Sequence, residues 1–191
     1  MNKGLLIVFS GPSGVGKGTV IKELMKKTEL NLIYSVSMTT RKPREGEIDG
    51  VNYFFVSKEE FEQAIANHEF LEYARFVDNY YGTPKAYVEK QRALGKNVLL
   101  EIETIGAKQV LDISKDDPGC LSIFMAPPSI EELEARIRGR QTETEAVIQK
   151  RVARARQELQ EASHYQHVIV NDKVDVAVKE ISDIILNRYQ K

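Results

Sequence analysis

Residues 5–19 read LLIVFSGPSGVGKGT, an apolar run that passes directly into a glycine-rich segment. The apolar run at residues 5–9 shows no alternation with polar residues, which is typical of a parallel strand buried on both faces. The glycines allow the backbone to curl so that successive N–H groups point inward at an anion. A helical pattern then begins at Lys17, and the helix start adds its partial positive charge to the same place. The stretch therefore predicts a strand, a phosphate-binding loop and a helix, with Lys17 able to reach the β- and γ-phosphates of a nucleotide.

The pattern G-x-x-x-x-G-K-[ST] is matched from Gly11 to Lys17 but fails at its last position. Residue 18 is glycine, and the hydroxyl comes one place later, at Thr19. A chance glycine-rich turn is the alternative reading, but a strand, a loop and an amphipathic helix all occur in the required order. Because Gly18 offers no hydroxyl, we expect phosphate oxygens and water to hold most of the coordination of a magnesium ion.

The composition is that of an ordinary globular chain. Its 191 residues fit one domain, or one domain with inserted lids, and 42% of them are hydrophobic and 29% charged. A formal net charge of -1 provides no global basic field, so neither nucleic acid nor a membrane is expected as a partner. The single cysteine, Cys120, lies in an apolar run and excludes a disulfide within the chain. No signal peptide or transmembrane stretch is recognisable, so we expect a cytoplasmic protein, and no signal for an oligomeric state is present.

Further elements follow from local patterns. Ser57 and Ser129 are each followed three residues later by glutamate, which predicts two helix starts of the capping-box type. Thr83 is expected to be an N-cap, with Pro84 at the first helical position and Gly95 just past the helix end. Apolar runs and apolar spacing predict strands at residues 32–36, 70–76, 97–103, 121–126 and 167–170, a hairpin partner strand within residues 49–56, and a last helix at residues 174–189.

Hydroxyls and arginines are concentrated beside turn-forming residues between residues 37 and 53. Arg41 and Arg44 are three residues apart, and two guanidinium groups can grip a phosphate bidentately. A solvated basic loop is the alternative interpretation of this segment alone.

The longer stretch SVSMTTRKPREGEIDGVNYFF at residues 35–55, taken with GPSGVGKGT, resembles the guanylate kinase family. The resemblance continues to about residue 172 through FLEYARF, NYYGTP, APPS, GRQTETE and VIVND. It implies an α/β chain with the P-loop nucleoside-monophosphate kinase fold, in which helices flank a parallel sheet. Within one domain it implies a core at residues 1–36, 85–135 and 157–191, a small mixed α/β insert that binds GMP at residues 37–84, and a helical lid at residues 136–156.

The resemblance also implies ATP and GMP as substrates, with Mg²⁺ accompanying ATP. Contacts with ATP are implied for Gly11, Pro12, Ser13, Gly14, Val15, Gly16, Lys17, Gly18, Thr19 and Asn171. Contacts with GMP are implied for Ser37, Arg41, Arg44, Glu47, Tyr53, Glu72, Tyr81, Thr83 and Glu101. Roles in phosphoryl transfer are implied for Lys17, Arg44, Arg136, Arg140 and Arg151. Glu103 is implied on the magnesium side, acting through a water molecule.

Glu72 would face the base in this interpretation. Guanine presents N1–H and an exocyclic amino group side by side, and one carboxylate can accept both, whereas adenine offers no such pair of donors. An exposed strand carboxylate is the alternative for Glu72, and purely structural roles are the alternative for Tyr81 and Thr83.

The chain departs from the family pattern at Thr83, Glu103, Thr104, Ile105 and Gln141. Two other functions stay open from sequence. Guanylate-kinase-like domains also occur as modules that bind phosphorylated peptides, but those usually have damaged phosphate loops, and this chain keeps Lys17 and the arginines of the lid. The second is another small-molecule phosphate kinase with the same core.

Overall fold

The computed structural model describes residues 3–139 and 144–189, and in this part of the chain two sheets are present. The larger has five parallel strands in the order β2-β7-β1-β8-β9. Their bounds are β1 Leu6–Ser10, β2 Leu32–Tyr34, β7 Asn97–Glu101, β8 Cys120–Ala126 and β9 His167–Val170. The order places β1 at the centre, so the phosphate loop that follows it emerges in the middle of the sheet edge.

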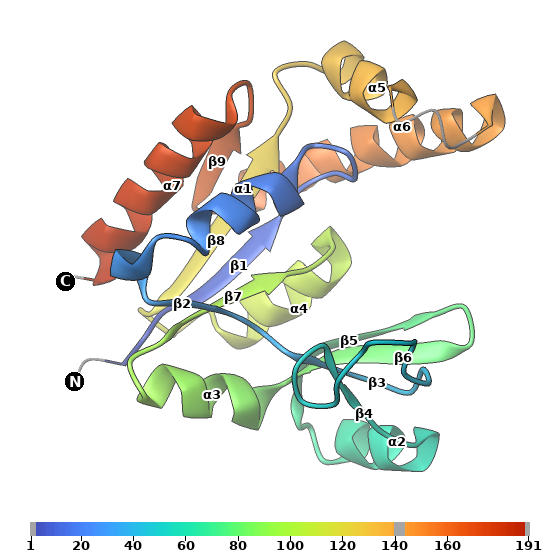
Figure 1. The fold of residues 1–191 in the computed structure, drawn as a ribbon, viewed down its shortest axis with the longest axis vertical. Helices are drawn as coiled ribbons and strands as arrows, with labels where there is room; N and C mark the ends of the chain where they lie inside the picture. The colour runs from blue at the N-terminus through green and yellow to red at the C-terminus, as the bar shows by residue number, and fades with distance from the viewer. Residues whose placement is uncertain (1–2, 140–143, 190–191) are drawn as a thin grey trace.

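Helices cover both faces of this sheet (Figure 1). Helices α1 (Lys17–Leu24) and α7 (Val174–Tyr189) lie on one face, and α3 (Lys85–Ala93) and α4 (Thr104–Ile113) lie on the other. Helices α5 (Ile130–Arg138) and α6 (Glu145–Gln160) pack on each other and extend past the end of the sheet that carries the phosphate loop. Two short 3-10 segments lie at Thr28–Leu30 and Glu161–His164.

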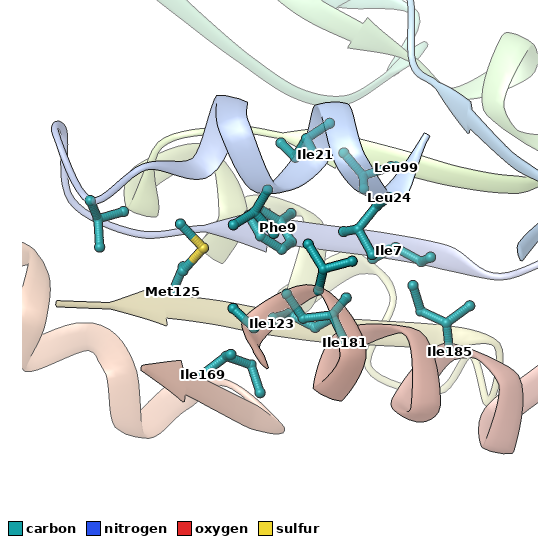
Figure 2. Close-up of a cluster of buried hydrophobic side chains, with 14 of the residues drawn as sticks. Ile7, Phe9, Ile21, Leu24, Leu99, Ile123, Met125, Ile169, Ile181 and Ile185 are labelled. Atoms are coloured by element: carbon teal, nitrogen blue, oxygen red, sulfur yellow. The ribbon is translucent and has the colours of Figure 1, made fainter. Parts of the chain in front are cut away.

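Strand β1 is buried on both faces, as its unbroken apolar run predicts. Ile7 and Phe9 pack in the cluster beneath α1 and α7, whereas Leu6 and Val8 pack in the cluster beneath α3 and α4. Figure 2 shows the first cluster, in which side chains of α1 and α7 meet those of β1, β7, β8 and β9. Since alternate residues of one strand supply both clusters, β1 holds the two helical layers in register with the loop that follows it.

The second sheet is mixed and has the order β4-β3-β6-β5 in the described residues. Its elements are β3 Ser37–Thr39, β4 Tyr53–Phe55, β5 Phe70–Phe76 and β6 Asn79–Pro84, with α2 at Lys58–Ala66. Phe61 of α2 stacks on Phe70 with ring centroids 4.4 Å apart and on Tyr80 at 5.2 Å. This small aromatic cluster is the core of the second sheet, which lies apart from the larger one (Figure 1).

The prediction of a hairpin partner strand within residues 49–56 is wrong in its direction. Strand β4 pairs with β3 in parallel, with Ser37 opposite Tyr53 and Thr39 opposite Phe55. The connection between them therefore returns the chain to the start of β3, and Asp49 Oδ1 secures this return by accepting the N–H of Phe55 at 2.9 Å. Local turn residues do not distinguish such a return from a hairpin.

Three boundary predictions also need correction. The strand predicted at residues 32–36 ends at Tyr34. Thr83 does not cap α3, because it lies within β6 and its hydroxyl donates to Glu72, while Pro84 occupies the N-cap position. The strand predicted at residues 97–103 ends at Glu101, and Glu103 is the N-cap residue of α4. Pairing with β1 extends only to the Phe9–Glu101 pair, so the acids beyond that point leave the sheet.

Other local predictions are confirmed. Ser57 and Glu60 form a reciprocal capping box, and Ser129 accepts the N–H of Glu132 at 3.1 Å. Gly95 follows α3 with a φ of +78°, and Cys120 is buried in β8, where burial raises the pKa of its thiol to about 11. Among the described residues, no helix has the length and apolar character that crossing a membrane requires.

Candidate functional site

The loop after β1 can only be built with glycine at key positions. Gly11 has a φ of +147°, and a Cβ there would lie 2.3 Å from the carbonyl oxygen of Met125 on the neighbouring strand. Gly16 is the N-cap residue of α1 with a φ of +99°. By contrast, a Cβ on Gly18 would meet nothing within 4 Å. Steric crowding therefore does not explain why position 18 lacks a residue with a hydroxyl group. The loop thus presents its amides at a helix N-terminus, the expected geometry for an anion.

Lys17 is folded back onto this loop. Its Nζ donates to the carbonyl oxygens of Gly11 at 2.6 Å and Pro12 at 3.1 Å. Burial lowers the pKa of Lys17, and the negative charges of Glu101, Glu158 and Glu103 oppose that shift. An ammonium group held by two neutral carbonyls in a partly buried site retains most of its capacity to bind an anion.

A cavity of about 610 Å³ lies in front of the loop. The carboxyl end of β7 and the start of α4 contribute acids to it, α6 contributes basic and acidic side chains, and Phe76 comes from the far end of β5. Its lining residues are Gly11, Ser13, Gly14, Gly16, Lys17, Gly18, Thr19, Phe76, Glu101, Ile102, Glu103, Arg151, Arg154 and Glu158. Most residues expected on ATP thus converge on one space, while Pro12 and Val15 are buried as supports of the loop.

The arginines of the predicted lid are placed differently from one another. Arg151 of α6 reaches across the cavity mouth, and its Nη2 donates to Ser13 Oγ at 2.8 Å. Arg136 lies behind the loop, where its Nη1 donates to the carbonyl oxygen of Asn171 at 3.0 Å. Asn171 in turn donates from Nδ2 to the carbonyl oxygen of Val15 at 2.8 Å. Predicted residues Arg140 and Gln141 lie outside the described residues.

A second, smaller cavity of about 120 Å³ lies between the two sheets. Four residues expected on GMP line it, namely Ser37, Tyr53, Thr83 and Glu101. Its other lining residues are Tyr34, Ser35, Asn52, Leu100 and Ile102. Glu101 belongs to the lining of both cavities, so its carboxylate marks the point where the two spaces approach each other.

Sequence reasoning missed the two residues that support this smaller cavity. The hydroxyl of Tyr34 donates to Glu101 Oε2 at 2.8 Å, which fixes the shared carboxylate. The buried hydroxyl of Ser35 has no hydrogen-bond partner among the described residues. The sequence signal for Ser35 was its position two residues before Ser37, which was already a candidate site residue.

Glu72 is a buried carboxylate rather than an exposed one. It is 8% exposed, and its Oε1 accepts the hydroxyl of Thr83 at 2.6 Å. Burial raises the pKa of Glu72, and the hydrogen bonds from Thr83 oppose this rise. Its other oxygen lies against Gly106 of α4, where an added Cβ would come within 3.0 Å. The pair Glu72–Thr83 thus stands at the back of the smaller cavity, with Thr83 on its surface.

The arginine segment meets the same cavity through its aromatic side chains. Arg41 pairs with Glu47 at 2.8 Å and lies over the ring of Tyr53, 5.4 Å from the centroid. The hydrogen bond that Arg41 donates to Glu47 raises the pKa of Arg41. Arg44 donates its backbone N–H to the second oxygen of Glu47 at 2.7 Å, and its side chain is exposed. Tyr53 and Tyr81 meet edge to face at 6.1 Å, so Arg41 and Tyr81 both contact the ring of Tyr53.

Glu103 has a partner that sequence reasoning also missed. Arg154 of α6 donates from Nη2 to Glu103 Oε2 at 2.8 Å and from Nε to Glu158 Oε1 at 3.0 Å. Glu103, Arg154 and Glu158 all line the larger cavity. The sequence signal for Arg154 and Glu158 was their helical spacing from Arg151, because residues 151, 154 and 158 share one face of a helix. Among the described residues, no group of three or more His, Cys, Asp and Glu side chains has the arrangement of a metal site.

The family model for guanylate kinase matches residues 3–188. The chain is 57% identical over 185 residues to a guanylate kinase of Mycoplasma mycoides, covering 97% of this chain and 61% of that protein. A Bacillus cereus guanylate kinase is 54% identical over 187 residues, which is 98% of this chain and 90% of that protein. The crystal structure of guanylate kinase from Anaplasma phagocytophilum superimposes with a TM-score of 0.73 at 32% identity, covering 100% of this chain and 89% of that one. The chain thus spans about three fifths of the length of the first of these relatives and nearly all of the others.

Proposed function

Because the chain belongs to the guanylate kinase family, we propose that it transfers the γ-phosphoryl group of ATP to GMP or dGMP, giving ADP and the nucleoside diphosphate. The observation that supports this most directly is the pair of cavities that share Glu101. The larger takes the triphosphate against the loop amides and Lys17, and the smaller, which at about 120 Å³ has room for only part of a nucleotide, marks the acceptor side. The shared lining residues Glu101 and Ile102 place the two spaces side by side, as a direct transfer between two nucleotides requires.

No general base is needed for this reaction. The attacking oxygen of the GMP phosphate is already anionic, so positioning and neutralisation of charge supply the catalysis. Lys17 leaves its two carbonyl partners for the ATP phosphates, and Arg41 leaves Glu47 for the GMP phosphate together with Arg44, Tyr53 and Tyr81. Both cations are held by replaceable partners in this structure, at 2.6 and 2.8 Å respectively, so the groups are present and already desolvated in part.

We propose further that Glu72, Thr83 and Ser37 recognise the base. Glu72 is the acceptor for the N1–H and amino donors of guanine, and Thr83 fixes it through the 2.6 Å hydrogen bond. Arg140, Arg151 and, once it leaves the carbonyl oxygen of Asn171 behind the loop, Arg136 neutralise the phosphoryl group in flight, with Asn171 on the adenine side of the loop.

Mg²⁺ accompanies ATP in this proposal. When bound, it neutralises and orients the oxygens of the β- and γ-phosphates. The donor set fits, because Glu101, Glu103 and the hydroxyl of Thr19 line the larger cavity and hard oxygen donors suit magnesium through its water shell. Gly18 contributes no hydroxyl, which gives Glu103 more weight.

The division of labour within the chain is proposed as a core at residues 1–36, 85–135 and 157–191, an acceptor insert at residues 37–84 and a lid at residues 136–156. The insert contains all four strands of the smaller sheet, and the lid includes the facing ends of α5 and α6. Closure of both over the cavities would exclude water, which is a competing nucleophile. A cytoplasmic location fits the buried thiol of Cys120.

The acceptor preference tests the function. In a coupled assay of ADP release, GMP and dGMP are expected to be phosphorylated, and AMP to be poorer by roughly 10²-fold or more in kcat/KM, because it leaves Glu72 without its donors. UMP and CMP complete the panel. Comparable rates for AMP and GMP would point to another small-molecule kinase, and no turnover with any acceptor would favour a phosphopeptide-binding module.

A variant ties that preference to the base site. Glu72→Gln presents one donor and one acceptor, so it is expected to lose activity with GMP and to narrow the ratio of GMP to AMP by at least about tenfold. Glu69→Gln is the matched control, since Glu69 is exposed just before β5. An unchanged ratio in Glu72→Gln would remove Glu72 from the base site.

The role of Glu103 is tested by varying magnesium. Glu103→Asp is expected to keep near-normal activity at saturating magnesium, because the shorter carboxylate still reaches a metal-bound water. Glu103→Ala is expected to raise the magnesium requirement and lower kcat, with GMP affinity, measured separately, nearly unchanged. Asp112→Ala on the exposed side of α4 is the control. If the alanine variant keeps the magnesium curve and kcat of the parent, Glu101 becomes the better candidate.

A further inference from the structure

One face of α6 lines the cavity in front of the phosphate loop. Arg151, Arg154 and Glu158 line that cavity together with Lys17. The spacing of three and four residues places all three on a single stripe of the helix. The function proposed above uses Arg151 and gives no role to the other two.

Arg154 of α6 pairs with two carboxylates in unlike surroundings, Glu103 at the start of α4 and Glu158 one turn further along α6 itself. Its Nη2 donates to Glu103 Oε2 at 2.8 Å, and Glu103 is 70% exposed. Its Nε donates to Glu158 Oε1 at 3.0 Å, and the Glu158 side chain is only 11% exposed. The Glu103 pair is screened by water and contributes little, whereas the carboxylate of Glu158 is largely desolvated although Arg154 is 51% exposed. A competing anion would therefore displace Glu103 and leave Glu158 in place.

Glu158 is itself an unexplained group. As a residue it is 9% exposed, and its Oε2 has no hydrogen-bond partner among the described residues. A buried carboxylate oxygen without a partner is costly, so an apolar side chain here would be less demanding for the fold. What the carboxylate provides at this position is a fixed acceptor for Arg154 at the wall of the cavity in front of the phosphate loop.

We propose that Arg154 is a further phosphate-binding residue for the donor nucleotide and that Glu158 is the positioning residue that holds its guanidinium toward the cavity. Glu103 is the partner that Arg154 exchanges for phosphate oxygens when the triphosphate arrives. Guanidinium forks suit phosphate oxygens, and the charge of Arg154 is already present at the site. This inference rests on the proposed function only in taking a nucleoside triphosphate as the donor.

The test is binding of the β,γ-imido analogue of ATP, with magnesium and without GMP, by titration calorimetry at fixed ionic strength. Arg154→Gln is expected to weaken binding of the analogue about tenfold, as lost charge-assisted hydrogen bonds do. Binding of AMP is expected to change less than about twofold, because Arg154 would meet only the distal phosphates. Arg156→Gln is the matched control, because Arg156 is an exposed arginine two residues away and its substitution removes the same charge.

Equal affinity of Arg154→Gln and the parent for the analogue would overturn the proposal, and so would equal losses for AMP or in Arg156→Gln. If the affinity is unchanged, Arg154 only stabilises the packing of α6 on the core. Thermal melting would then show a lower melting temperature for Arg154→Gln without any change in affinity. Since GMP is absent from the titration, failure to phosphorylate GMP would refute the proposed function alone. Normal activity with GMP beside an unchanged affinity in Arg154→Gln would refute this inference alone.

The positioning role has its own readout. Glu158→Ala removes the acceptor and is expected to weaken binding of the analogue nearly as much as Arg154→Gln, whereas Glu158→Gln keeps an oxygen for Nε and is expected to retain most of the affinity. The double variant Arg154→Gln/Glu158→Ala is expected to bind no more weakly than Arg154→Gln. Additive losses in the double variant would show that Glu158 does not act through Arg154. If the alanine variant does not fold, Glu158→Met, which keeps the length of the side chain and removes the acceptor, takes its place in both measurements.

Discussion

Replacing Lys17 by methionine is expected to lower kcat by about 10³-fold or more, since a preorganised donor to charge that develops in the transition state typically contributes that much. Methionine keeps the unbranched stem and removes only the ammonium group. In this structure the ammonium is held at 2.6 Å from the carbonyl oxygen of Gly11, inside the loop that would hold the phosphates. ADP release with ATP and GMP at saturation measures the effect.

Loss of folding is not expected to explain that result. Burial lowers the pKa of Lys17 in the folded protein, despite the opposing charges of Glu101, Glu158 and Glu103. A lysine whose pKa is lowered by folding destabilises the fold at pH values below that pKa, and the penalty vanishes as the pH rises past the ordinary value of 10.5. At neutral pH, Lys17→Met should therefore melt at the parent temperature or above it.

Lys22→Met is the matched control, because Lys22 is an exposed lysine on the same helix. It should keep both kcat and KM. Lys17→Arg should recover little of the lost rate, since the larger planar group does not fit where two carbonyls enclose an ammonium. A kcat within about tenfold of the parent in Lys17→Met would remove Lys17 from the transfer step.

The stretch from β1 to α1 could be predicted nearly residue by residue because its determinants are local. The unbroken apolar run and the spacing of the glycines each reflect the conformation of the residues that carry them. The parallel pairing of β3 and β4 was not accessible in this way, because Ser37 and Tyr53 become neighbours only through a return of the chain. Sequence shows that a strand exists there but not which way it points.

Thr83 shows how two sound local arguments compete. A threonine before a proline suits an N-cap, but the buried carboxylate of Glu72 needs a donor, and the 2.6 Å hydrogen bond shows which requirement prevails. Burying an unpaired carboxylate costs more than a missing helix cap. The resemblance to a family predicted that both residues face the base, while the link between them comes from the structure.

Within the site, sequence reasoning predicted the carboxylates Glu101 and Glu103 as site residues and missed the groups that hold them. Tyr34 supports Glu101 from 67 positions away in the chain, and Arg154 reaches Glu103 from 51 positions away. Such contacts depend on how a helix or an edge strand is docked. A charged residue on an amphipathic helix reads as solvent-exposed until that docking is known.

Arg92 is the clearest instance, because an arginine near the end of α3 is buried to 1% exposure. Its Nε donates to the carbonyl oxygen of Gly4 at 2.9 Å, and its Nη1 donates to Glu89 at 2.8 Å and to Asp117 at 2.6 Å. Gly119 packs so closely that an added Cβ would lie 2.7 Å from Arg92 Nη2. One guanidinium thus joins α3 to the amino ends of β1 and β8, at the edge opposite the candidate site.

Arg92→Met is expected to lower the free energy of unfolding by about 3 kcal/mol, the lower end of the range for breaking a buried ion pair. The lower end applies because Asp117 and Glu89 are 27% and 37% exposed and can regain some hydration. Unfolding in urea measures the change. Arg156→Met, at an exposed position, should stay within about 0.5 kcal/mol of the parent.

The dependence on pH identifies the cause of that loss. Burial favours a higher pKa for Asp117, but the hydrogen bonds from Arg92 and from the Gly119 N–H, with the charge of Arg92, bring its pKa below the ordinary 3.8. A carboxyl group whose pKa is lowered by folding adds stability above its unfolded pKa, and loses it as the pH falls through the folded value. The penalty of Arg92→Met should therefore be full at neutral pH and shrink in acid. The double variant Arg92→Met/Asp117→Asn should cost less than the two single changes summed, because it leaves no buried charge unpaired. If the penalty does not depend on pH and the two single changes are additive, the loss comes from packing around the stem of Arg92 instead. In either case kcat at 25 °C should be unaffected, because the cluster lies at the far edge of the sheet.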